Sequence, residues 1–523
     1  MKLTGFLFAA ALLGTCTQPA AEENYTRHVD PKIGTGGHGH VFVGANVPFG
    51  LVQVGPTSIP QTWDWCSGYH ASDSTVIGFS HTHLSGTGIG DLFDITVMPV
   101  VGEVTYARGE ENDPASGLWS YADRTREITK PGYYSVPLVR YGITAELTAT
   151  ERVGLHRYTF PASDAAAVVF DLENGGCWDK ATDTGFRFSA GWAKNQEVYF
   201  VAEFSKPAKG ISYLQPGEID DSKMPRIAAR YARVDFDTAE GEQVLVKVAL
   251  SPVSIEGAKA NLAAELPGWD FDATAAAADK AWNDELSKVK IETEDETSKR
   301  IFYTALYHTM VAPSLFCDVN GDYRGADGKV HENPGRDTYT TFSLWDTYRA
   351  AMPLMTVLHP ERMPDIIQTM LHIADEQGRL PVWHLWGNET DCMVGNPGIV
   401  AVADAIVKGI GGFDREKAFE TIRKTAMNPD RGNGLRMEYG YIPCEMFNEA
   451  VAYDMEYALA DGAAARAAEA LGKAEDAKYF EERSHSYRNY FDPQTGFMRG
   501  RDSKKGWRTP FNAFASTHRA DDY

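Results

Sequence analysis

The sequence has 523 residues, enough for two or more domains, and its composition of 43% hydrophobic and 23% charged residues is that of a folded globular protein. The formal net charge of -22 argues against nucleic acid and anionic lipid as the main partners, because the chain has no excess of cations to neutralise phosphate groups. Neutral sugars and metal ions remain compatible with this charge.

The first residues are typical of a targeting segment. Lys2 supplies a positive charge, residues 6–13 form a short apolar run, and a Leu-Gly-Thr-Cys sequence ends at Cys16. The run is too short to span a bilayer and predicts a signal peptide over residues 1–22. Because Cys16 also fits a bacterial lipoprotein box, we expect export to the periplasm or cell surface, with a lipid anchor at Cys16 as an open possibility and no transmembrane segment.

The remaining cysteines form no recognisable motif. They are far apart and odd in number, at Cys66, Cys177, Cys317, Cys392 and Cys444. Neither a disulfide framework nor a CxxC metal motif is visible, so we expect free, buried thiols.

The first half of the mature chain predicts strands. Residues 29–252 are rich in glycine, β-branched and aromatic residues, and residues 244–250 alternate with the period of two that a strand requires. Residues 234–237 alternate similarly, and residues 167–170 form a short apolar run. Many short strands separated by turn residues indicate a β-sandwich domain over residues 25–257.

Helical patterns begin near Ala258. Apolar residues from Phe271 to Val289 recur every three or four positions, which predicts linker helices over residues 258–295. Further stripes cover residues 302–310, 363–374, 450–459, 463–471 and 480–490, and Gly378 closes the second of them. Repeated helices with long loops predict an (α/α)6 toroid over residues 296–523. The pattern accounts for about half of such a ring, so we expect the toroid to be incomplete in this chain.

Three segments combine aromatic and acidic residues. The segments hold Trp63 and Trp65, then Trp345 and Asp346, and then Trp383, Trp386, Asn388, Glu389 and Asp391. Sugars present flat C–H faces and hydroxyl groups, so aromatic platforms beside carboxylates and amides form a carbohydrate site. The alternative is that the tryptophans belong to the core and the acids cap helices, as with Asp346 near an expected N-cap.

Two other motifs have structural interpretations. His81 and His83 are spaced as a metal pair, but no third ligand accompanies them, and a hydrogen-bonding role is favoured. Gly34, Gly36, Gly37 and Gly39 match neither a dinucleotide fingerprint nor a P-loop and indicate a tight loop between strands.

The sequence closely resembles glycoside hydrolase family 92, the exo-acting α-mannosidases. The segments that carry the resemblance include VDPKIGTGGHGHVFVGANVPFGLVQVGP (29–56), TWDWCSGYH (62–70), IGFSHTHLSGTGIGDLFDI (77–95), FSLWDTYRAAMPLMTVLHPE (342–361), WGNETDCMVGNPGI (386–399) and YFDPQTGFMRGRD (490–502). They run in family order along nearly the whole mature chain.

The resemblance implies a β-sandwich packed on an (α/α)6 toroid, and hydrolysis of terminal α-mannosides in glycans with inversion and with the help of calcium. Inversion needs one carboxyl group as acid and another as base on opposite faces of the sugar. The family's motifs for these two groups do not occur in this sequence, so we expect them beyond Tyr523, expect the chain as written to be inactive, and assign neither a catalytic residue nor a metal ligand.

The residues that match the sugar-binding half are Trp63, Trp65, Trp345, Asp346, Asn388, Glu389, Asp391 and, more weakly, Glu445. Two alternatives stay open: a non-catalytic surface protein that binds glycans, and another toroid sugar enzyme such as a phosphorylase or a trehalose-type hydrolase. The mannosidic linkage stays open as well.

Overall fold

The computed structural model describes residues 23–514 except residues 90, 173–175, 180–183, 190–195 and 215–229, and of residues 176–179, 184–189 and 196 it describes only the backbone. The expected signal peptide, with Cys16, lies outside the described residues. Among the described residues, no helix is both long and apolar enough to cross a membrane.

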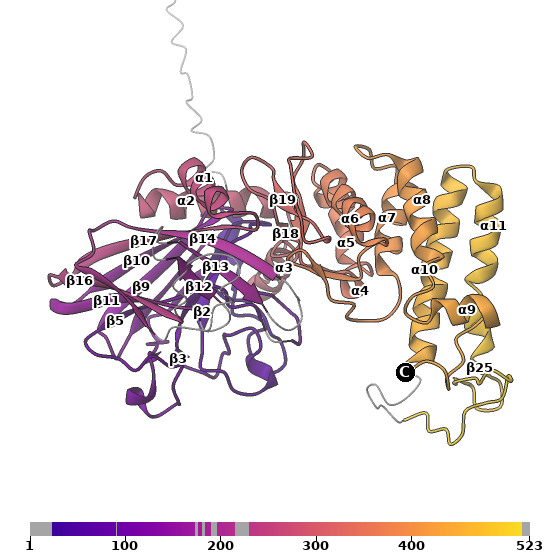
Figure 1. The fold of residues 1–523 in the computed structure, drawn as a ribbon, viewed down its shortest axis with the longest axis horizontal. Coiled ribbons are helices and arrows are strands. Elements are labelled where there is room, and N and C mark those ends of the chain that lie inside the picture. The colour runs from indigo at the N-terminus through magenta and orange to yellow at the C-terminus, as the bar shows by residue number, and fades with distance from the viewer. Residues whose placement is uncertain are drawn as a thin grey trace, which may run out of the picture.

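Two large antiparallel sheets make up the N-terminal part (Figure 1). The seven-stranded sheet has the order β1 (Ala45–Asn46), β2 (Gln53–Thr57), β4 (Gly78–Ser80), β5 (Thr96–Val101), β11 (Ser163–Asp171), β16 (Tyr231–Thr238) and β15 (Gly210–Leu214). The eight-stranded sheet has the order β12 (Gly176–Asp179), β13 (Thr184–Ser189), β14 (Gln196–Phe204), β17 (Glu242–Ser251), β10 (Val153–Phe160), β9 (Ile143–Ala149), β8 (Tyr133–Leu138) and β7 (Ile128–Lys130).

Short strands complete the sheet structure. The two-stranded pairs are β3 (Thr75–Val76) with β6 (Ser120–Tyr121), β18 (Ser314–Leu315) with β21 (Tyr339–Thr340), β19 (Tyr323–Arg324) with β20 (Val330–His331), and β25 (Phe491–Asp492) with β26 (Phe497–Met498). A three-stranded sheet contains β22 (Phe342–Ser343), β23 (Trp383–Leu385) and β24 (Asn388–Glu389).

The alternation seen in the sequence follows the two faces of the strands. In β16, Val234 and Phe236 are buried, whereas Asp235 and Asp237 are more exposed. Val168 in β11 and Val246 in β17 belong to the same buried apolar cluster, which joins the inner faces of the two sheets. The predicted β-sandwich is therefore confirmed.

The chain after β17 is mainly helical, as predicted. The helices are α1 (Ile255–Glu265), α2 (Phe271–Leu286), α3 (Glu296–His308), α4 (Leu344–Thr347), α5 (Ala351–Leu358), α6 (Met363–Gln377), α7 (Pro397–Val407), α8 (Arg415–Ala426), α9 (Asn433–Tyr439), α10 (Ala450–Ala470) and α11 (Ala474–Arg483). Figure 1 shows α1 and α2 lying over the sandwich and the later helices extending away from it, with α9, α10 and α11 at the far end. The predicted class, a β-sandwich followed by a helical domain, is confirmed.

Local signals in the sequence explain several helix ends. Asp270 caps α2 by accepting a hydrogen bond from the backbone N–H of Ala273. Gly378 ends α6 with a left-handed φ of 91°, as expected of a helix C-terminus. The two stripes predicted over residues 450–459 and 463–471 belong to one continuous helix, α10.

The sandwich and the helices are joined by backbone hydrogen bonds. The N–H of Phe49 donates to the carbonyl of Met310 at 2.8 Å, and the N–H of Leu315 donates to the carbonyl of Phe49, also at 2.8 Å. The indole of Trp282 in α2 donates to the carbonyl of Asn46 at 2.7 Å. Residues on both sides share one buried apolar cluster, so the junction is a packed interface with a defined geometry.

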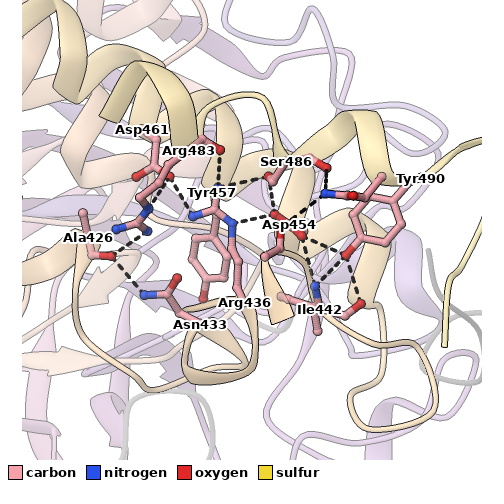
Figure 2. A network of polar contacts seen from close by, with 12 residues as sticks. Ala426, Asn433, Arg436, Ile442, Asp454, Tyr457, Asp461, Arg483, Ser486 and Tyr490 are labelled. Atoms are coloured by element: carbon pink, nitrogen blue, oxygen red, sulfur yellow. Dashed lines mark hydrogen bonds and ion pairs between the residues drawn. The ribbon is translucent and has the colours of Figure 1, made fainter. Parts of the chain in front are cut away.

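A buried network of charges holds the far helices together (Figure 2). Arg436 in α9 pairs with Asp454 and Asp461 in α10, and Arg483 in α11 pairs with Asp461 at 3.2 Å. The hydroxyl of Tyr490 donates to Asp454 at 2.8 Å. Two arginines and two aspartates balance in charge, which is the condition for burying ions without a large cost.

The thiol prediction is confirmed in part. Among the described side chains, Cys66, Cys317, Cys392 and Cys444 form no disulfide; Cys317 and Cys444 are buried, and the other two are half-buried. The side chain of Cys177 lies outside what the structure describes.

Candidate functional site

A cavity of about 290 Å³ lies where the sandwich meets the helices. Its walls come from β2 and the loop after β4, from the end of α3 and the segment after it, and from β22, α4, α5 and β23. The lining residues most relevant to chemistry are Gln53, His83, Ser85, Thr87, His308, Thr309, Ser343, Asp346, Thr347 and Trp383. Hydroxyl, amide, imidazole and carboxyl groups thus face one space together with an indole.

Asp346 is the predicted site residue that lines this cavity directly. It lies in the first turn of α4, and its carboxylate accepts a hydrogen bond from the hydroxyl of Ser343 at 2.8 Å. Ser343, rather than Asp346, occupies the N-cap position. The side chain of Asp346 is largely exposed, so its remaining lone pairs are available to a ligand.

Trp345 lies beside Asp346 but has different surroundings. Its indole N–H is buried and finds no acceptor among the described residues. The guanidinium of Arg349 lies over the ring at 4.9 Å from its centre, and Arg349 is itself paired with Glu456 of α10 at 2.8 Å. Trp345 does not line the cavity, and its indole N–H is turned away from solvent, so the structure does not present it to a ligand there.

The three-stranded sheet brings the second and third predicted clusters together. Ser343 in β22 pairs with Trp383 in β23, and Leu385 in β23 pairs with Asn388 in β24. The turn that carries Trp345 and Asp346 therefore begins on the same small sheet that carries Asn388 and Glu389. Sequence spacing alone places these clusters about forty residues apart.

Glu389 uses its carboxylate within this sheet. It accepts hydrogen bonds from the backbone N–H groups of Val382 at 2.8 Å, Trp383 at 2.9 Å and Asp391 at 3.0 Å. With three backbone donors on two oxygens, Glu389 holds the β23–β24 turn in place. It positions Trp383, which lines the cavity.

Asp391 and Glu445 make other contacts. Asp391 accepts a hydrogen bond from Arg379 and lies 3.6 Å from the guanidinium of Arg431. Glu445 accepts from the backbone N–H of Ser503 at 2.8 Å, in a loop that does not line the cavity. Neither carboxylate is brought to the cavity wall.

The two tryptophans of the first cluster, Trp63 and Trp65, make contacts in different places. Trp63 is 55% exposed, and its indole donates to the carbonyl of Gly88 at 2.8 Å, next to the loop that lines the cavity. Trp65 instead stacks on His70 at 4.2 Å and donates to Asp73 at 2.7 Å. Trp63 therefore borders the cavity loop, whereas Trp65 packs within the sandwich domain.

Two lining residues gave no signal in the sequence. Gln53 lies in β2, and His308 ends α3, where it looks like an ordinary member of a helical stripe. Burial lowers the pKa of His308 to about 4, and its Nε2 has no partner among the described residues. Only the packing of α3 against the sandwich brings it to the cavity.

His81 and His83 have the hydrogen-bonding roles that the sequence favoured. His81 bonds the carbonyl of Ile95 at 2.6 Å and the ring of His156 at 2.9 Å. His83 bonds Asp91 at 2.9 Å and Ser80 at 2.9 Å. The glycine loop is tight, as predicted, because a Cβ at Gly39 would lie 1.7 Å from the carbonyl oxygen of Gly34. Its predicted place between two strands is wrong, because among the described residues the loop connects a 3-10 helix (Tyr25–His28) to β1.

One trio among the described residues has the spacing of a metal site: Glu285, His359 and Glu361. The ammonium of Lys288 already lies 2.8 Å from both carboxylates and 3.2 Å from His359 Nδ1. Calcium prefers six to eight oxygen ligands. The trio therefore does not fit calcium, and we assign no calcium ligand.

Comparison with known families gives two matches that together cover most of the chain. The model of the glycosyl hydrolase family 92 N-terminal domain matches residues 28–251, and that of the family 92 catalytic domain matches residues 257–523.

Solved structures agree with this. The chain is 39% identical to a family GH92 α-mannosidase from Bacteroides thetaiotaomicron, solved in complex with mannoimidazole; the match covers 94% of this chain and 67% of that chain, with a TM-score of 0.89. A family GH92 inverting mannosidase from Bacteroides thetaiotaomicron VPI-5482 is 30% identical over 94% of this chain and 68% of that chain, with a TM-score of 0.81.

A curated relative, described as an uncharacterized secreted glycosidase of Arthroderma benhamiae, is 26% identical over 542 residues and covers 92% of this chain. The chain spans 64% of the length of that relative.

Proposed function

Because the chain belongs to glycoside hydrolase family 92, we propose that it is part of an exo-α-mannosidase that removes terminal α-linked mannose from glycans with inversion. The observation that carries this proposal is the cavity at the domain junction, which combines Asp346 and Trp383 with hydroxyl and amide groups. Its volume of about 290 Å³ lies at the small end of ligand sites and suits one sugar ring rather than a long chain.

We assign Asp346 to the binding of sugar hydroxyl groups. It is the one carboxyl group among the described residues that line the cavity. Inverting hydrolysis requires two carboxyl groups roughly 6.5–9.5 Å apart, one as acid and one as base. A single carboxylate that already accepts a hydrogen bond from Ser343 suits ligand binding, and we propose no catalytic acid or base among the described residues.

The other predicted residues support the site in different ways. Trp345 precedes Asp346 in α4 without lining the cavity, and Trp63 is an exposed aromatic surface beside the cavity loop. Glu389 and Asn388 act through the β23–β24 turn that carries Trp383. Calcium, which we propose from family membership alone, would help to distort the sugar when bound.

The experiment is a hydrolysis assay with an aryl α-mannoside and mannobioses, using the complete product of the natural gene rather than the 523-residue chain alone, because we assign no catalytic acid or base to the described residues. We expect release of mannose as the β-anomer, detected by NMR, and loss of turnover with a chelator that calcium restores. Asp346→Ala should lower kcat/KM by one to two orders of magnitude, because a hydrogen bond to a charged group contributes about 1.5–3 kcal/mol.

Asp272→Ala is the matched control, since Asp272 also lies in the first turn of a helix but is exposed at the surface of α2. Near-normal turnover by a folded Asp346→Ala protein would contradict the assignment. Binding of mannose without any turnover by the wild-type protein would instead favour a glycan-binding protein.

We also propose that the protein is exported and acts on mannose-containing glycans at the periplasm or cell surface, with Cys16 as the site of a lipid anchor if one is present. The support is the apolar run at residues 6–13 and a relative described as secreted. Fractionation of the producing cells tests this. Mature protein should appear in the exported fraction, and an uncleaved protein in the cytoplasm would contradict the proposal.

A further inference from the structure

A buried carboxylate lies directly behind the cavity wall. The side chain of Asp91 is fully buried. One of its oxygens accepts hydrogen bonds from the backbone N–H groups of Leu84 at 2.7 Å and Leu92 at 2.5 Å. The other lies 2.9 Å from Nδ1 of His83. Asp91 therefore closes the loop that contains the cavity-lining residues 84–87.

Both ring nitrogens of His83 make hydrogen bonds within the protein. Because Nδ1 faces a carboxylate, it carries the proton, and Nε2 accepts a hydrogen bond from the hydroxyl of Ser80 at 2.9 Å. Ser80 in turn lies 2.7 Å from the hydroxyl of Thr57. Although His83 lines the cavity, both of its ring nitrogens are engaged within the protein, so it supports the wall and does not bind the ligand.

The same loop holds the turn that carries Trp63. The backbone N–H of Asp91 donates to the carbonyl of Cys66 at 3.0 Å, and the thiol of Cys66 lies 3.4 Å from the carbonyl of Thr87. The indole of Trp63 donates to the carbonyl of Gly88 at 2.8 Å. A Cβ at Gly88 would lie 2.8 Å from the indole ring, so the loop and Trp63 are in direct contact.

We propose that Asp91 is a positioning residue for sugar binding: through Leu84, Leu92 and His83 it fixes both the cavity wall at residues 84–87 and the Trp63 turn. This inference rests on the proposed function. Removing the carboxylate leaves two backbone N–H groups and an imidazole N–H buried without acceptors. The loop must then move to reach other partners, and the wall and Trp63 move with it.

Binding of methyl α-mannoside, measured by calorimetry on the full-length protein, tests the proposal. We expect Asp91→Ala to raise the Kd at least tenfold while the circular dichroism spectrum stays native. Asp91→Asn should recover part of the affinity, because its amide oxygen can still accept from the loop N–H groups and His83 can change tautomer.

Asp318→Ala is the matched control. Asp318 is also a buried aspartate that accepts two side-chain hydrogen bonds, from Ser251 at 2.8 Å and Asn261 at 2.8 Å, but it does not line the cavity. This variant should lose stability and keep its affinity for the sugar. An unchanged Kd in folded Asp91→Ala would overturn the proposal, and so would an equal loss of affinity in Asp91→Ala and Asp318→Ala. If Asp91→Ala does not fold, Asp91→Asn replaces it. Wild-type affinity in Asp91→Asn, together with undisturbed hydrogen exchange at the loop amides, would then overturn the proposal.

Hydrogen exchange separates this inference from the proposed function. If the wild-type protein does not bind the mannoside, the proposed function fails, but the role of Asp91 in holding the loop is still testable. Asp91→Ala should then lose protection at the amides of Leu84 and Leu92, whereas Asp318→Ala should not. Unchanged protection at both amides would refute the role of Asp91 by itself.

Discussion

Replacing Arg436 by leucine is expected to lower the stability of the α9–α11 region by about 3–5 kcal/mol, the range observed when one partner of a buried ion pair is removed. Arg436 is 4% exposed, and its guanidinium donates to Asp454 at 2.6 Å and to Asp461 at 2.7 Å. It also donates to the carbonyl of Arg483 and the hydroxyl of Ser486, both at 3.0 Å. The variant leaves two buried carboxylates with one arginine.

Arg466→Leu is the matched control. Arg466 lies on α10, the helix that carries Asp454 and Asp461, and pairs with Glu469 at 2.7 Å, but its side chain is 54% exposed. Exposed pairs contribute little, so this variant should behave like the wild-type protein. Arg436→Lys should lie between the two, because lysine keeps the charge and loses the planar fork that reaches both aspartates.

Hydrogen exchange at the amides of α9 and α10 is the measurement, because a chain with two domains does not unfold in one step and a single unfolding free energy is not defined. Equal protection in Arg436→Leu and Arg466→Leu would mean that the network of Figure 2 adds nothing to the stability of these helices.

The same network explains where prediction from sequence stopped in the helical domain. Apolar spacing was sufficient to predict α6 and its end at Gly378, because both signals are local. The stripe over residues 450–471 appeared broken near Asp461 and Gly462, yet α10 is continuous there. A charged residue such as Asp461 on the buried face of a helix interrupts the apolar pattern from which a helix is predicted. Its burial is explained only by its partner, Arg436, which lies 25 residues away in the sequence.

In the candidate site, too, the local features could be predicted from the sequence, whereas the contacts between distant residues could not. The aromatic-acidic segments could be identified from residue types, and Asp346 does line a cavity. The use of each carboxylate could not be predicted, because it depends on contacts made in the folded chain: Glu389 serves three backbone N–H groups and Asp346 serves one hydroxyl. The contributions of Gln53, His308 and Asp91 arise from packing between distant segments, for which one sequence carries no signal.

The sandwich is expected to lose stability as the pH falls from 6.5 to about 4, because of a buried pair of histidines. The side chains of His81 and His156 are fully buried in the sandwich, and their Nε2 atoms lie 2.9 Å apart. Burial lowers the pKa of His81 to about 4 and holds that of His156 well below its ordinary range.

The hydrogen bonds define the protons of this pair. Tyr158 donates its hydroxyl hydrogen to Nδ1 of His156 at 2.7 Å, so His156 carries its proton on Nε2 and donates to Nε2 of His81. His81 then donates from Nδ1 to the carbonyl of Ile95 at 2.6 Å. The chain is complete with both rings neutral. A proton added to Nε2 of His81 would place two N–H groups against each other, and a proton added to Nδ1 of His156 would break the hydrogen bond that Tyr158 donates.

Because both histidines are buried in the neutral form, acid lowers the stability of the sandwich. A histidine with a lowered pKa in the folded state contributes stability that is complete above pH 6.5 and is lost as the pH falls through its folded pKa. For His81, the shift from 6.5 to about 4 corresponds to about 3 kcal/mol, a large part of the stability of an ordinary domain. Burial raises the pKa of two carboxyl groups in or against the sandwich, Asp91 and Asp318, and their protonation in acid acts in the opposite direction.

Comparison with a His81→Gln, His156→Gln double variant isolates the histidines from these carboxyl groups. Hydrogen exchange of β9, β10 and β17 between pH 7 and pH 4 should show a steep loss of protection in the wild-type protein and a shallower one in the variant. Nitrogen-15 spectra of the imidazole rings provide a second measurement that does not depend on the variant folding: both rings should stay neutral at pH 5.5. Protonation of either ring at that pH in the folded protein would contradict the hydrogen-bond chain, because a charged ring cannot accept the hydrogen bond that its neighbour donates.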